Sequence, residues 1–480
     1  MQRSMRAAIL AAVALAPGSI SCSGASMPEA VRDITIARIA IQQGVELTLM
    51  KDGQAVVPQY AAPITGRAGV LHVEFIPRFS GVHDVTALVE LDSGSTIATK
   101  KIVRQVDGST LTQSVDFELA ASDLPASTSF RVRFVSTTPG DSGGEGAPAE
   151  YPPAALQPAP VNLQKSGTLR IKLIPIRYDA DGSGRIADSG PTHVEELKKR
   201  FLDLYPITAV DITVGDPLPW AKKIASNGDG HADLLDSIVA LRAQEHPSDE
   251  VYYLGLFATT PTYSEYCGHK CTTGLSLRVA QASQAERRAS VAVGYSETRS
   301  METSLHEIGH AHGRQHAPCG VSNADAAFPH EKAALGAEGY SALTKTFYDP
   351  AKNYDFMSYC DPAWVSDYTF GALLTRVQEV STVALPQQRL AVRRPMRMLQ
   401  VRPNGASKWG PQFSLDRAPT GEPIAIDTTA VDGAKTRIVG YKYNYEDREG
   451  GHVLVSPDDA RGKKVELDFD DTKVRLDPED

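Results

Sequence analysis

The sequence contains few cysteines, no excess of basic charge and no long apolar run after its first residues. Its 480 residues include 5 cysteines, and 49 lysines and arginines stand against 58 aspartates and glutamates, for a formal net charge of −9. A negative chain without a basic stripe argues against a nucleic-acid partner. No segment after residue 22 is apolar enough to cross a bilayer. An apolar content of 42% and a charged content of 22% are typical of a soluble protein, and the length allows several domains.

The first 22 residues predict an export signal. Arg3 and Arg6 precede a short apolar run over 7–17, which is too short to span a membrane. The following Ser-Ile-Ser-Cys, which ends at Cys22, resembles the bacterial lipobox, in which the cysteine is acylated and becomes the mature N-terminus. The usual leucine is missing from its first position, so cleavage near Ala25 without a lipid anchor is the alternative. Both routes predict export.

A histidine-rich stretch over 305–316 carries the clearest pattern in the chain. It reads His-Glu-x-x-His-x-x-Gly-x-x-His, with His306, His310 and His316 as its histidines. Residues four apart lie about 40° apart around a helix axis, so His306 and His310 project from one face and can bind one metal ion. Glu307 lies about 100° round from His306, beside such a metal site.

A turn after the helix would complete the site. In a continuing helix His316 would lie about 240° round from His310, but Gly313 can adopt left-handed angles, end the helix and return His316 as a third ligand. Three imidazoles and one water form the open site typical of catalytic zinc, and Glu307 can accept a proton from that water. His312 points about 200° away from His310 and is expected to be packed or solvated. The alternative, a surface helix with chance histidines, is disfavoured by the spacing.

The extended motif resembles that of the metzincin zinc endopeptidases. The resemblance implies a tight turn downstream whose methionine lies beneath the zinc, and 354–360 supplies such a turn with Met357. Tyr359 matches the astacin, serralysin and pappalysin branches, in which that tyrosine moves between the metal and the tetrahedral intermediate. An ordinary core methionine is the alternative for Met357 taken alone.

Four cysteines remain when Cys22 is set aside, and they allow three disulfide pairings. Cys319 follows the third histidine by three residues, and Cys360 follows the methionine of the turn by three. In a metzincin both places lie under the zinc, so the resemblance favours a Cys319–Cys360 disulfide. Cys267 and Cys271 would then close a small loop. Four reduced cysteines are disfavoured in an oxidising compartment, and a structural zinc on all four is poorly supported by a single close pair.

The chain divides into five segments by pattern, beginning with the signal at 1–22. Alternating apolar and polar residues over 31–136 predict an immunoglobulin-like β-sandwich. Residues 137–167 are rich in proline, glycine and serine and predict an extended linker. Alternating strands and helices over 168–386 predict an α/β domain whose mixed sheet carries the zinc helix. Short strands over 387–480 predict a small β domain.

The resemblance also bears on how a substrate would bind. In metzincins an edge strand near the zinc helix pairs with the substrate backbone, and either 291–295 or 275–279 would fill that place. Trp364 follows the methionine turn where metzincins build the wall of a substrate pocket, and a core position is the alternative.

A short acidic loop is a weaker candidate for a metal site. Residues 179–184 place oxygen-bearing side chains at positions one, three and five and glycine at six, as in the first half of a calcium loop. Position twelve is Gly190, where such a loop carries a glutamate. A plain Asp/Gly turn is therefore the alternative to calcium.

Together these patterns predict an exported zinc endopeptidase that acts on extracellular proteins or glycoproteins, with Glu307 as general base and Tyr359 as oxyanion stabiliser. The β domains around a metzincin core resemble bacterial proteases that cleave mucins and other glycoproteins, and Tyr359 fits pappalysin-like enzymes as well. The alternative is a surface-anchored binding protein with a structural or vestigial zinc site, which the retained Glu307 disfavours. Zinc-dependent hydrolysis of a non-peptide bond is a third interpretation.

Overall fold

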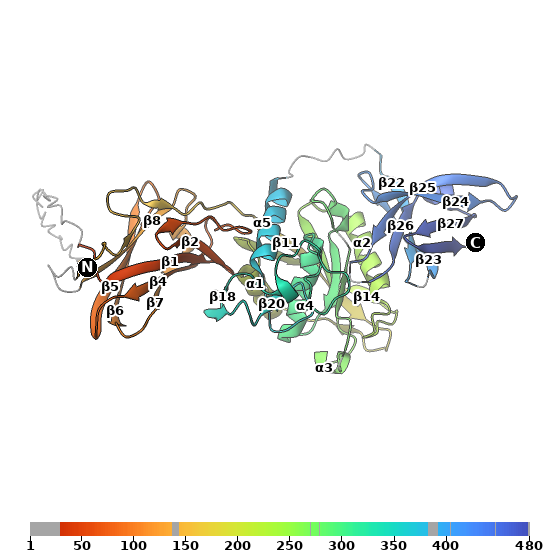
Figure 1. The fold of residues 1–480 in the computed structure, drawn as a ribbon. Helices are drawn as coiled ribbons and strands as arrows, with labels where there is room; N and C mark the ends of the chain where they lie inside the picture. Colours follow the sequence, from red (N-terminus) through yellow and green to blue (C-terminus); the bar gives the residue numbers. More distant parts are fainter. Residues whose placement is uncertain are drawn as a thin grey trace, which may run out of the picture.

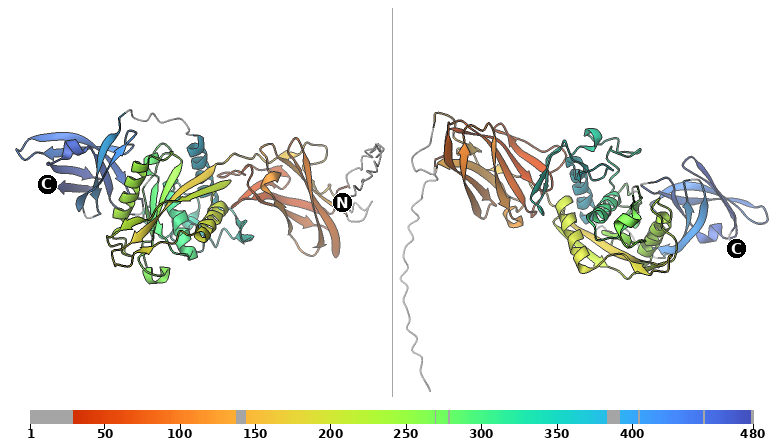
Figure 2. Two further views of the ribbon diagram at one scale, coloured as in Figure 1. Left: turned by 180° about the vertical axis from the view of Figure 1, so that it is seen from behind. Right: turned by 90° about the horizontal axis from the view of Figure 1, so that it is seen from below.

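The computed structural model describes residues 29–136, 144–268, 270–277, 279–382, 392–403, 405–446 and 448–478. These residues form three parts in chain order along an elongated molecule: an N-terminal part of β-sheets, a central α/β part and a C-terminal β part (Figure 1). Views from behind and from below show the same order (Figure 2). Among the described helices, none is long and apolar enough to cross a bilayer. The predicted signal, with Cys22, lies outside the described residues.

The N-terminal part contains two antiparallel sheets that enclose an apolar core. The first has the order β3-β2-β1-β4-β7, from β1 (Ile34–Gln42), β2 (Glu46–Lys51), β3 (Gln54–Ala55), β4 (Gly69–Pro77) and β7 (Gln113–Leu119). The second has the order β10-β8-β5-β6, with β9 also on β8, from β5 (Val82–Asp92), β6 (Ile97–Asp107), β8 (Ser129–Ser136), β9 (Glu150–Tyr151) and β10 (Ala159–Pro160). Phe75 and Phe134 meet between the sheets with ring centroids 4.7 Å apart.

Part of the stretch with linker composition belongs to this second sheet. Strands β9 and β10 lie within 137–167, and both pair with β8. Tyr151 and Val161 are buried. Short edge positions tolerate proline, because the missing amide hydrogen is not needed there. Composition alone therefore overstates how open this stretch is, although residues 137–143 lie outside the described part of the chain.

The central part is built on the mixed sheet that the strand and helix order predicts. Its order is β12-β11-β15-β17-β16, with β13 and β14 also on β11. The strands are β11 (Thr168–Tyr178), β12 (Arg185–Ile186), β13 (Ala209–Val214), β14 (Leu218–Trp220), β15 (Val251–Phe257), β16 (Gly274–Ser276) and β17 (Ala289–Val293). Strand β17 runs parallel to β15, whereas β16 runs antiparallel to β17 at the edge. Of the two candidate edge strands, the one that includes 275–276 is therefore at the edge.

Helices and small hairpins complete the central part. The longer helices are α1 (Pro191–Leu204), α2 (His231–Glu245), α4 (Thr298–Ala311) and α5 (Asp367–Thr382). The short elements are α3 (Tyr263–Tyr266), the hairpin of β18 (Gly339–Ser341) and β19 (Thr346–Tyr348), and the pair of β20 (Tyr354–Asp355) and β21 (Ala363–Trp364). Single 3₁₀ turns cover Ala121–Asp123, Ala285–Arg287 and Glu331–Ala333.

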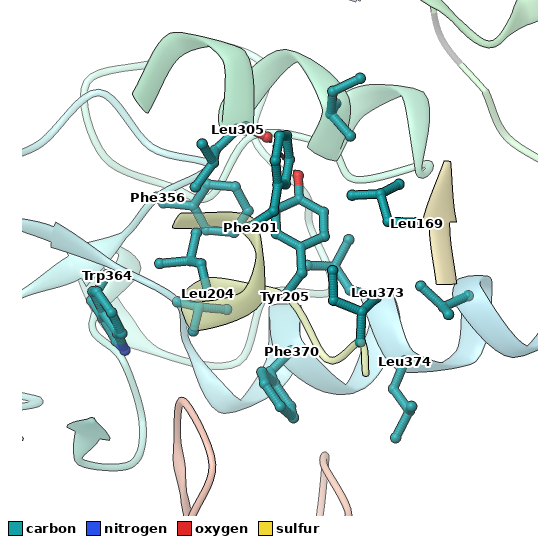
Figure 3. Close-up of a cluster of buried hydrophobic side chains, with 14 of the residues drawn as sticks. Leu169, Phe201, Leu204, Tyr205, Leu305, Phe356, Trp364, Phe370, Leu373 and Leu374 are labelled. Carbon is teal, nitrogen blue, oxygen red and sulfur yellow. Dashed lines mark hydrogen bonds between the residues drawn. The ribbon is translucent and has the colours of Figure 1, made fainter. Parts of the chain in front are cut away.

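An apolar cluster between α1, α4 and α5 holds the histidine helix in place (Figure 3). Phe201 and Tyr205, at the C-terminal end of α1, and Phe370 of α5 are among the largest fully buried side chains. The Tyr205 hydroxyl donates a hydrogen bond to the Leu305 carbonyl of α4 at 2.5 Å. Burial raises the pKa of Tyr205 well above its usual value, so the phenol stays protonated and remains a donor. The helix is thus fixed both by packing and by a directional bond.

The N-terminal part contacts the central part through buried polar groups. The guanidinium of Arg67 donates to the carbonyls of Asp203 and Ile207 at 3.0 Å each, and burial lowers its pKa to about 10, against a smaller opposing effect of the Asp203 charge. Trp364 donates from its indole nitrogen to the Gly44 carbonyl at 2.7 Å. Trp364 is also buried and stacked on Tyr348 at 4.2 Å, so it belongs to this contact rather than to an open pocket wall.

The C-terminal part is one curled antiparallel sheet, resembling half a barrel, of order β23-β22-β26-β25-β24-β27-β28. Its elements are β22 (Arg394–Val401), β23 (Ser407–Leu415), β24 (Glu422–Thr429), β25 (Lys435–Asn444), β26 (Gly451–Val455), α6 (Pro457–Ala460), β27 (Lys464–Phe469) and β28 (Thr472–Leu476). It lies against α2, where the buried carboxylate of Asp236 accepts hydrogen bonds from Gln400 at 2.6 Å and from the Tyr445 hydroxyl at 2.9 Å.

Candidate metal centre

Helix α4 presents the histidines because its other face is apolar. Met301, Leu305 and Ile308 are 5%, 5% and 0% exposed, at the spacing that lines one side of a helix. The Ser300 hydroxyl donates to the Val293 carbonyl at 2.8 Å and accepts from the Tyr295 amide at 2.8 Å, which joins the start of α4 to the end of β17. The helix is therefore fixed against the sheet at its N-terminus.

The helix ends where the spacing predicts. Gly313 has a φ of +85°, and its amide donates to the His310 carbonyl at 2.8 Å. A Cβ at this position would also lie 2.7 Å from the Val279 carbonyl oxygen, so both backbone angle and space require glycine. The chain then turns and brings His316 back toward the helix.

The three histidines converge at one point. Their candidate ligand atoms all lie within 4.8 Å of one another, and the Nε2 atoms of His306 and His310 are 3.0 Å apart. His310 and His316 are almost fully buried. Within the described part of the chain, this group can hold a metal ion, as the spacing predicts.

The hydrogen bonds behind the rings favour a cation at this point. His306 Nδ1 lies 2.8 Å from the Phe356 carbonyl oxygen, and His310 Nδ1 lies 2.7 Å from that of Arg314. A carbonyl oxygen only accepts, so each Nδ1 carries a hydrogen, and in the neutral form of each ring Nε2 is the atom that can bind a metal. The two Nε2 atoms lie 3.0 Å apart, so both can bind the same ion. These residues therefore fit zinc, for which neutral imidazole is a preferred ligand.

Glu307 lies in a small notch beside the histidines. Its side chain is buried, and the Ser276 hydroxyl of β16 is 2.7 Å from Oε2. A Cβ at Gly274, two residues earlier on that strand, would lie 2.2 Å from Oε1. Gly274 and Ser276 were not singled out from the sequence. The available signal was their spacing of two, which places both on one face of a strand.

The methionine turn packs against Gly309 of the histidine helix. Met357 is 1% exposed, and its Sδ would be 2.5 Å from a Cβ at Gly309, so the glycine allows the turn to approach. Asp355 holds the turn by accepting from the Met357 amide at 2.8 Å and the Ser366 amide at 3.0 Å. Burial raises the pKa of Asp355, and these hydrogen bonds oppose the shift.

Tyr359 stands next to the histidines and faces solvent. Its ring centroid is 4.9 Å from that of His316 and 5.9 Å from that of His306, and the residue is 57% exposed. Its amide donates to the Cys319 carbonyl at 3.0 Å. The tyrosine is thus anchored by its backbone while its side chain borders the site.

The described residues contain two disulfides, Cys319–Cys360 and Cys267–Cys271. The first links the segment after the third histidine to the methionine turn, beside the Ala317 amide that donates to the Met357 carbonyl at 3.0 Å. These are the pairings that the resemblance favours. Disulfides indicate that the described chain folds in an oxidising, extracytoplasmic environment.

We expect loss of the Cys319–Cys360 disulfide to be strongly destabilising. The bond closes a loop with a sequence separation of 41, for which the loss of loop-closure entropy is worth about 4 kcal/mol. The double variant Cys319→Ser with Cys360→Ser should therefore unfold at much lower urea concentration, as followed by tryptophan fluorescence in zinc-free protein.

The second disulfide provides the matched control. Cys267 and Cys271 have a sequence separation of only 4. The variant with serine at both positions should therefore lose about half as much free energy of unfolding, roughly 2 kcal/mol. Equal losses for the two pairs would show that loop closure is not what the longer disulfide contributes.

The remaining candidates fall elsewhere. His312 is buried and stacked on Tyr252 at 4.2 Å, so it is packed and not a ligand. In the 179–184 loop, the Asp179 carboxylate accepts a hydrogen bond from the Gly184 amide at 3.1 Å, and the Asp181 carboxylate accepts one from the Ser183 amide at 3.0 Å. This is the hydrogen-bond pattern of a plain turn.

Comparison of the chain with protein-family models and with curated proteins gives no match. The interpretation of the site therefore rests on its geometry and on the motif.

Proposed function

We propose that the protein is an exported zinc-dependent endopeptidase that hydrolyses peptide bonds of extracellular proteins or glycoproteins. The observation that carries this proposal is the convergence of three imidazoles next to a buried carboxylate that is not one of them. A purely structural zinc site needs four protein ligands and no neighbouring base. The notch formed by Gly274 for Glu307 therefore supports hydrolysis over the alternative, a binding protein with a vestigial site.

His306, His310 and His316 would hold the metal. Zinc in such a site supplies Lewis-acid chemistry, which makes water acidic near pH 7 and polarises a carbonyl group. Glu307 accepts the proton of the attacking water and then delivers it to the leaving amine, the two tasks of a general base and acid. The Ser276 hydroxyl, 2.7 Å from Oε2, orients this carboxylate by donating a hydrogen bond to it.

Tyr359 is assigned to the developing oxyanion. Its exposed phenol borders His306 and His316, and a hydroxyl in that position can donate a hydrogen bond as negative charge builds on the carbonyl oxygen. The backbone anchor to Cys319 leaves the side chain able to rotate toward a substrate. The tyrosine therefore completes a set of base, oxyanion donor and metal ligands.

The disulfides and the flanking β parts support the proposed compartment and substrate class. The two disulfides support export, and a lipid anchor at Cys22 or cleavage near Ala25 are the two routes proposed for the N-terminus. The layout of β parts on both sides of a metzincin-like centre supports a protein or glycoprotein substrate of the mucin-cleaving or pappalysin-like type. No nucleic-acid partner is proposed.

The test is zinc content together with hydrolysis of casein and mucin. Purified protein is expected to carry one zinc per chain, to cleave at least one of these substrates, to lose activity with a chelator and to regain it with added zinc. Stoichiometric zinc without hydrolysis of any protein would support the binding protein instead. Metal-dependent activity on small esters or amides alone would support hydrolysis of a non-peptide bond.

Gly274→Ala is expected to impair the base without removing the metal. The new Cβ would meet Glu307 Oε1 at 2.2 Å and Cδ at 2.6 Å, so the carboxylate has to move. A displacement of about 1 Å at a catalytic group costs on the order of 100-fold, so kcat should fall by roughly that factor while zinc content stays at one per chain. The measurements are metal analysis and peptide kinetics.

Gly268→Ala is the control for this substitution. A Cβ there has nothing within 4 Å, so hydrolysis should match that of the unmodified protein. Full activity of the Gly274→Ala variant would mean that the notch does not position Glu307 for hydrolysis.

A further inference from the structure

Edge strand β16 directs alternate backbone groups away from the sheet. The Thr273 carbonyl, just before β16, accepts from the Val293 amide of β17 at 2.8 Å, so it faces the neighbouring strand. In an antiparallel strand the next residues alternate, and Gly274 and Ser276 therefore direct their backbone N–H and C=O groups outward. Gly274 adjoins Glu307, so this outer edge begins directly beside the metal centre.

The C-terminal part already occupies the far end of this edge. The Glu446 amide donates to the Ser276 carbonyl at 2.9 Å, and Leu277 forms an antiparallel bridge with Tyr445. Residues 444–446 thus add to β16 in the way that a bound peptide adds to a sheet edge. We call this segment the edge cover.

The edge cover is held by a buried polar network and not by a loose surface contact. The Tyr445 hydroxyl donates to Asp236 of α2, and His452 Nδ1 lies 3.1 Å from the other oxygen of that carboxylate. Tyr445, His452 and Asp236 are 4%, 1% and 0% exposed. Breaking a buried polar network is costly, because its groups lose their partners away from water. The network therefore holds the segment against the edge in the folded protein.

A cavity opens where the covered edge ends. It has a volume of about 620 Å³ and reaches from Tyr359 and His316 to residues 444–446, 448–450 and 469–472 of the C-terminal part. Tyr445 and Glu446, both in the edge cover, line it. The C-terminal part thus forms the wall opposite the metal ligands.

We propose that the edge cover is an end stop that determines how a substrate lies in the site. A substrate backbone can pair with β16 at Gly274, but at Ser276 the position is taken, so the chain must turn away into the cavity. Residues 444–446 then limit specificity on one side of the scissile bond. This inference rests on the proposed peptidase function and adds the C-terminal part to the substrate site.

The first test compares two series of peptides built on one cleaved sequence. One series is extended residue by residue before the scissile bond and the other after it. Binding to zinc-free protein is measured by fluorescence anisotropy, and kcat/KM is measured with zinc. One of the two series extends along β16 toward Ser276, where the edge cover is already paired. In that series the second and third added residues should change Kd and kcat/KM by less than about twofold, because no free strand edge remains for them.

The second test opens the edge. Glu446→Pro replaces the amide hydrogen that bonds Ser276 with a ring carbon, which cannot approach the Ser276 carbonyl to 2.9 Å, so this contact has to open. In this variant the second and third residues of the insensitive series should tighten Kd by about fivefold or more, the value of one recovered backbone hydrogen bond. Glu446→Ala loses the same side chain but keeps the amide hydrogen, so the difference between the two variants isolates the contribution of the backbone hydrogen bond to Ser276.

Each outcome decides between the proposals. Equal gains from extension on both sides in the unmodified protein would overturn the end stop while leaving the peptidase in place. Identical length dependence of the proline and alanine variants would overturn the end stop in the same way. Absence of zinc-dependent cleavage and of peptide binding would contradict the peptidase function on which the end stop depends.

Discussion

Glu307→Gln is expected to bind zinc as the unmodified protein does and to lose peptide hydrolysis by about 10²- to 10⁴-fold, the usual contribution of a positioned general base. Glutamine keeps the shape of the side chain, and its carbonyl oxygen can still accept from the Ser276 hydroxyl 2.7 Å away. It cannot accept a proton from water at neutral pH. The fall should therefore appear in kcat, with zinc content and thermal stability nearly unchanged.

Glu302→Gln on the same helix provides the matched control. Glu302 is an exposed residue of the same helix, and it is not one of the residues of the His-Glu-x-x-His-x-x-Gly-x-x-His motif. The Glu302→Gln substitution removes one charge from α4 and should leave kcat close to that of the unmodified protein. If Glu307→Gln retained full hydrolysis, the carboxylate in the Gly274 notch would have no part in the chemistry, and the proposed mechanism would be wrong.

The histidine cluster was predictable because the residues that form it lie close together in the sequence. Spacing along one helix places His306 and His310 together, and the one residue that tolerates a left-handed turn, Gly313, stands where the third histidine has to return. Each strand and helix of the mixed sheet is likewise marked by the periodicity of its own residues, and their alternation predicts the α/β class.

The support around Glu307 was not predictable from the same patterns. Gly274 and Ser276 lie more than 30 residues before Glu307, on a strand of three residues that pairs antiparallel with β17. Periodicity is weak over so short a strand, and nothing in the sequence tells which strand lies at the edge. Only the folded sheet shows that a missing side chain at Gly274 makes room for the carboxylate.

Contacts between the three parts could not be predicted from sequence patterns either. Trp364 donates to Gly44, which precedes it by 320 residues, and Glu446 donates to Ser276 from the C-terminal part. Such pairs depend on how whole sheets pack, and that is decided by shape and not by local propensity. The site is consequently larger than its motif, since a wall of the cavity beside Tyr359 comes from residues far along the chain.

His316→Ala is expected to lower zinc affinity by at least about 100-fold. Removing only a hydrogen-bond partner of a metal ligand typically costs 10- to 100-fold in affinity, and here a ligand itself is removed. The two remaining imidazoles come from one helical turn and leave an ion mostly bound by water. Affinity is measured by competition with a chromophoric chelator. A bound ion at 100 times its Kd adds about 2.7 kcal/mol to folding, so chelation should lower the melting temperature of the unmodified protein by several degrees and leave the variant unaffected.

His312→Asn distinguishes a ligand from a merely buried histidine of the same motif. An asparagine amide can still donate to the Ile308 carbonyl, which His312 Nδ1 reaches at 2.9 Å, although the stacking on Tyr252 is lost. This variant should melt at a lower temperature and yet bind zinc normally, the reverse of the expectation for His316→Ala. Were zinc affinity to fall in His312→Asn and persist in His316→Ala, the ion would be held elsewhere, and Glu307 would have no metal beside it to work with.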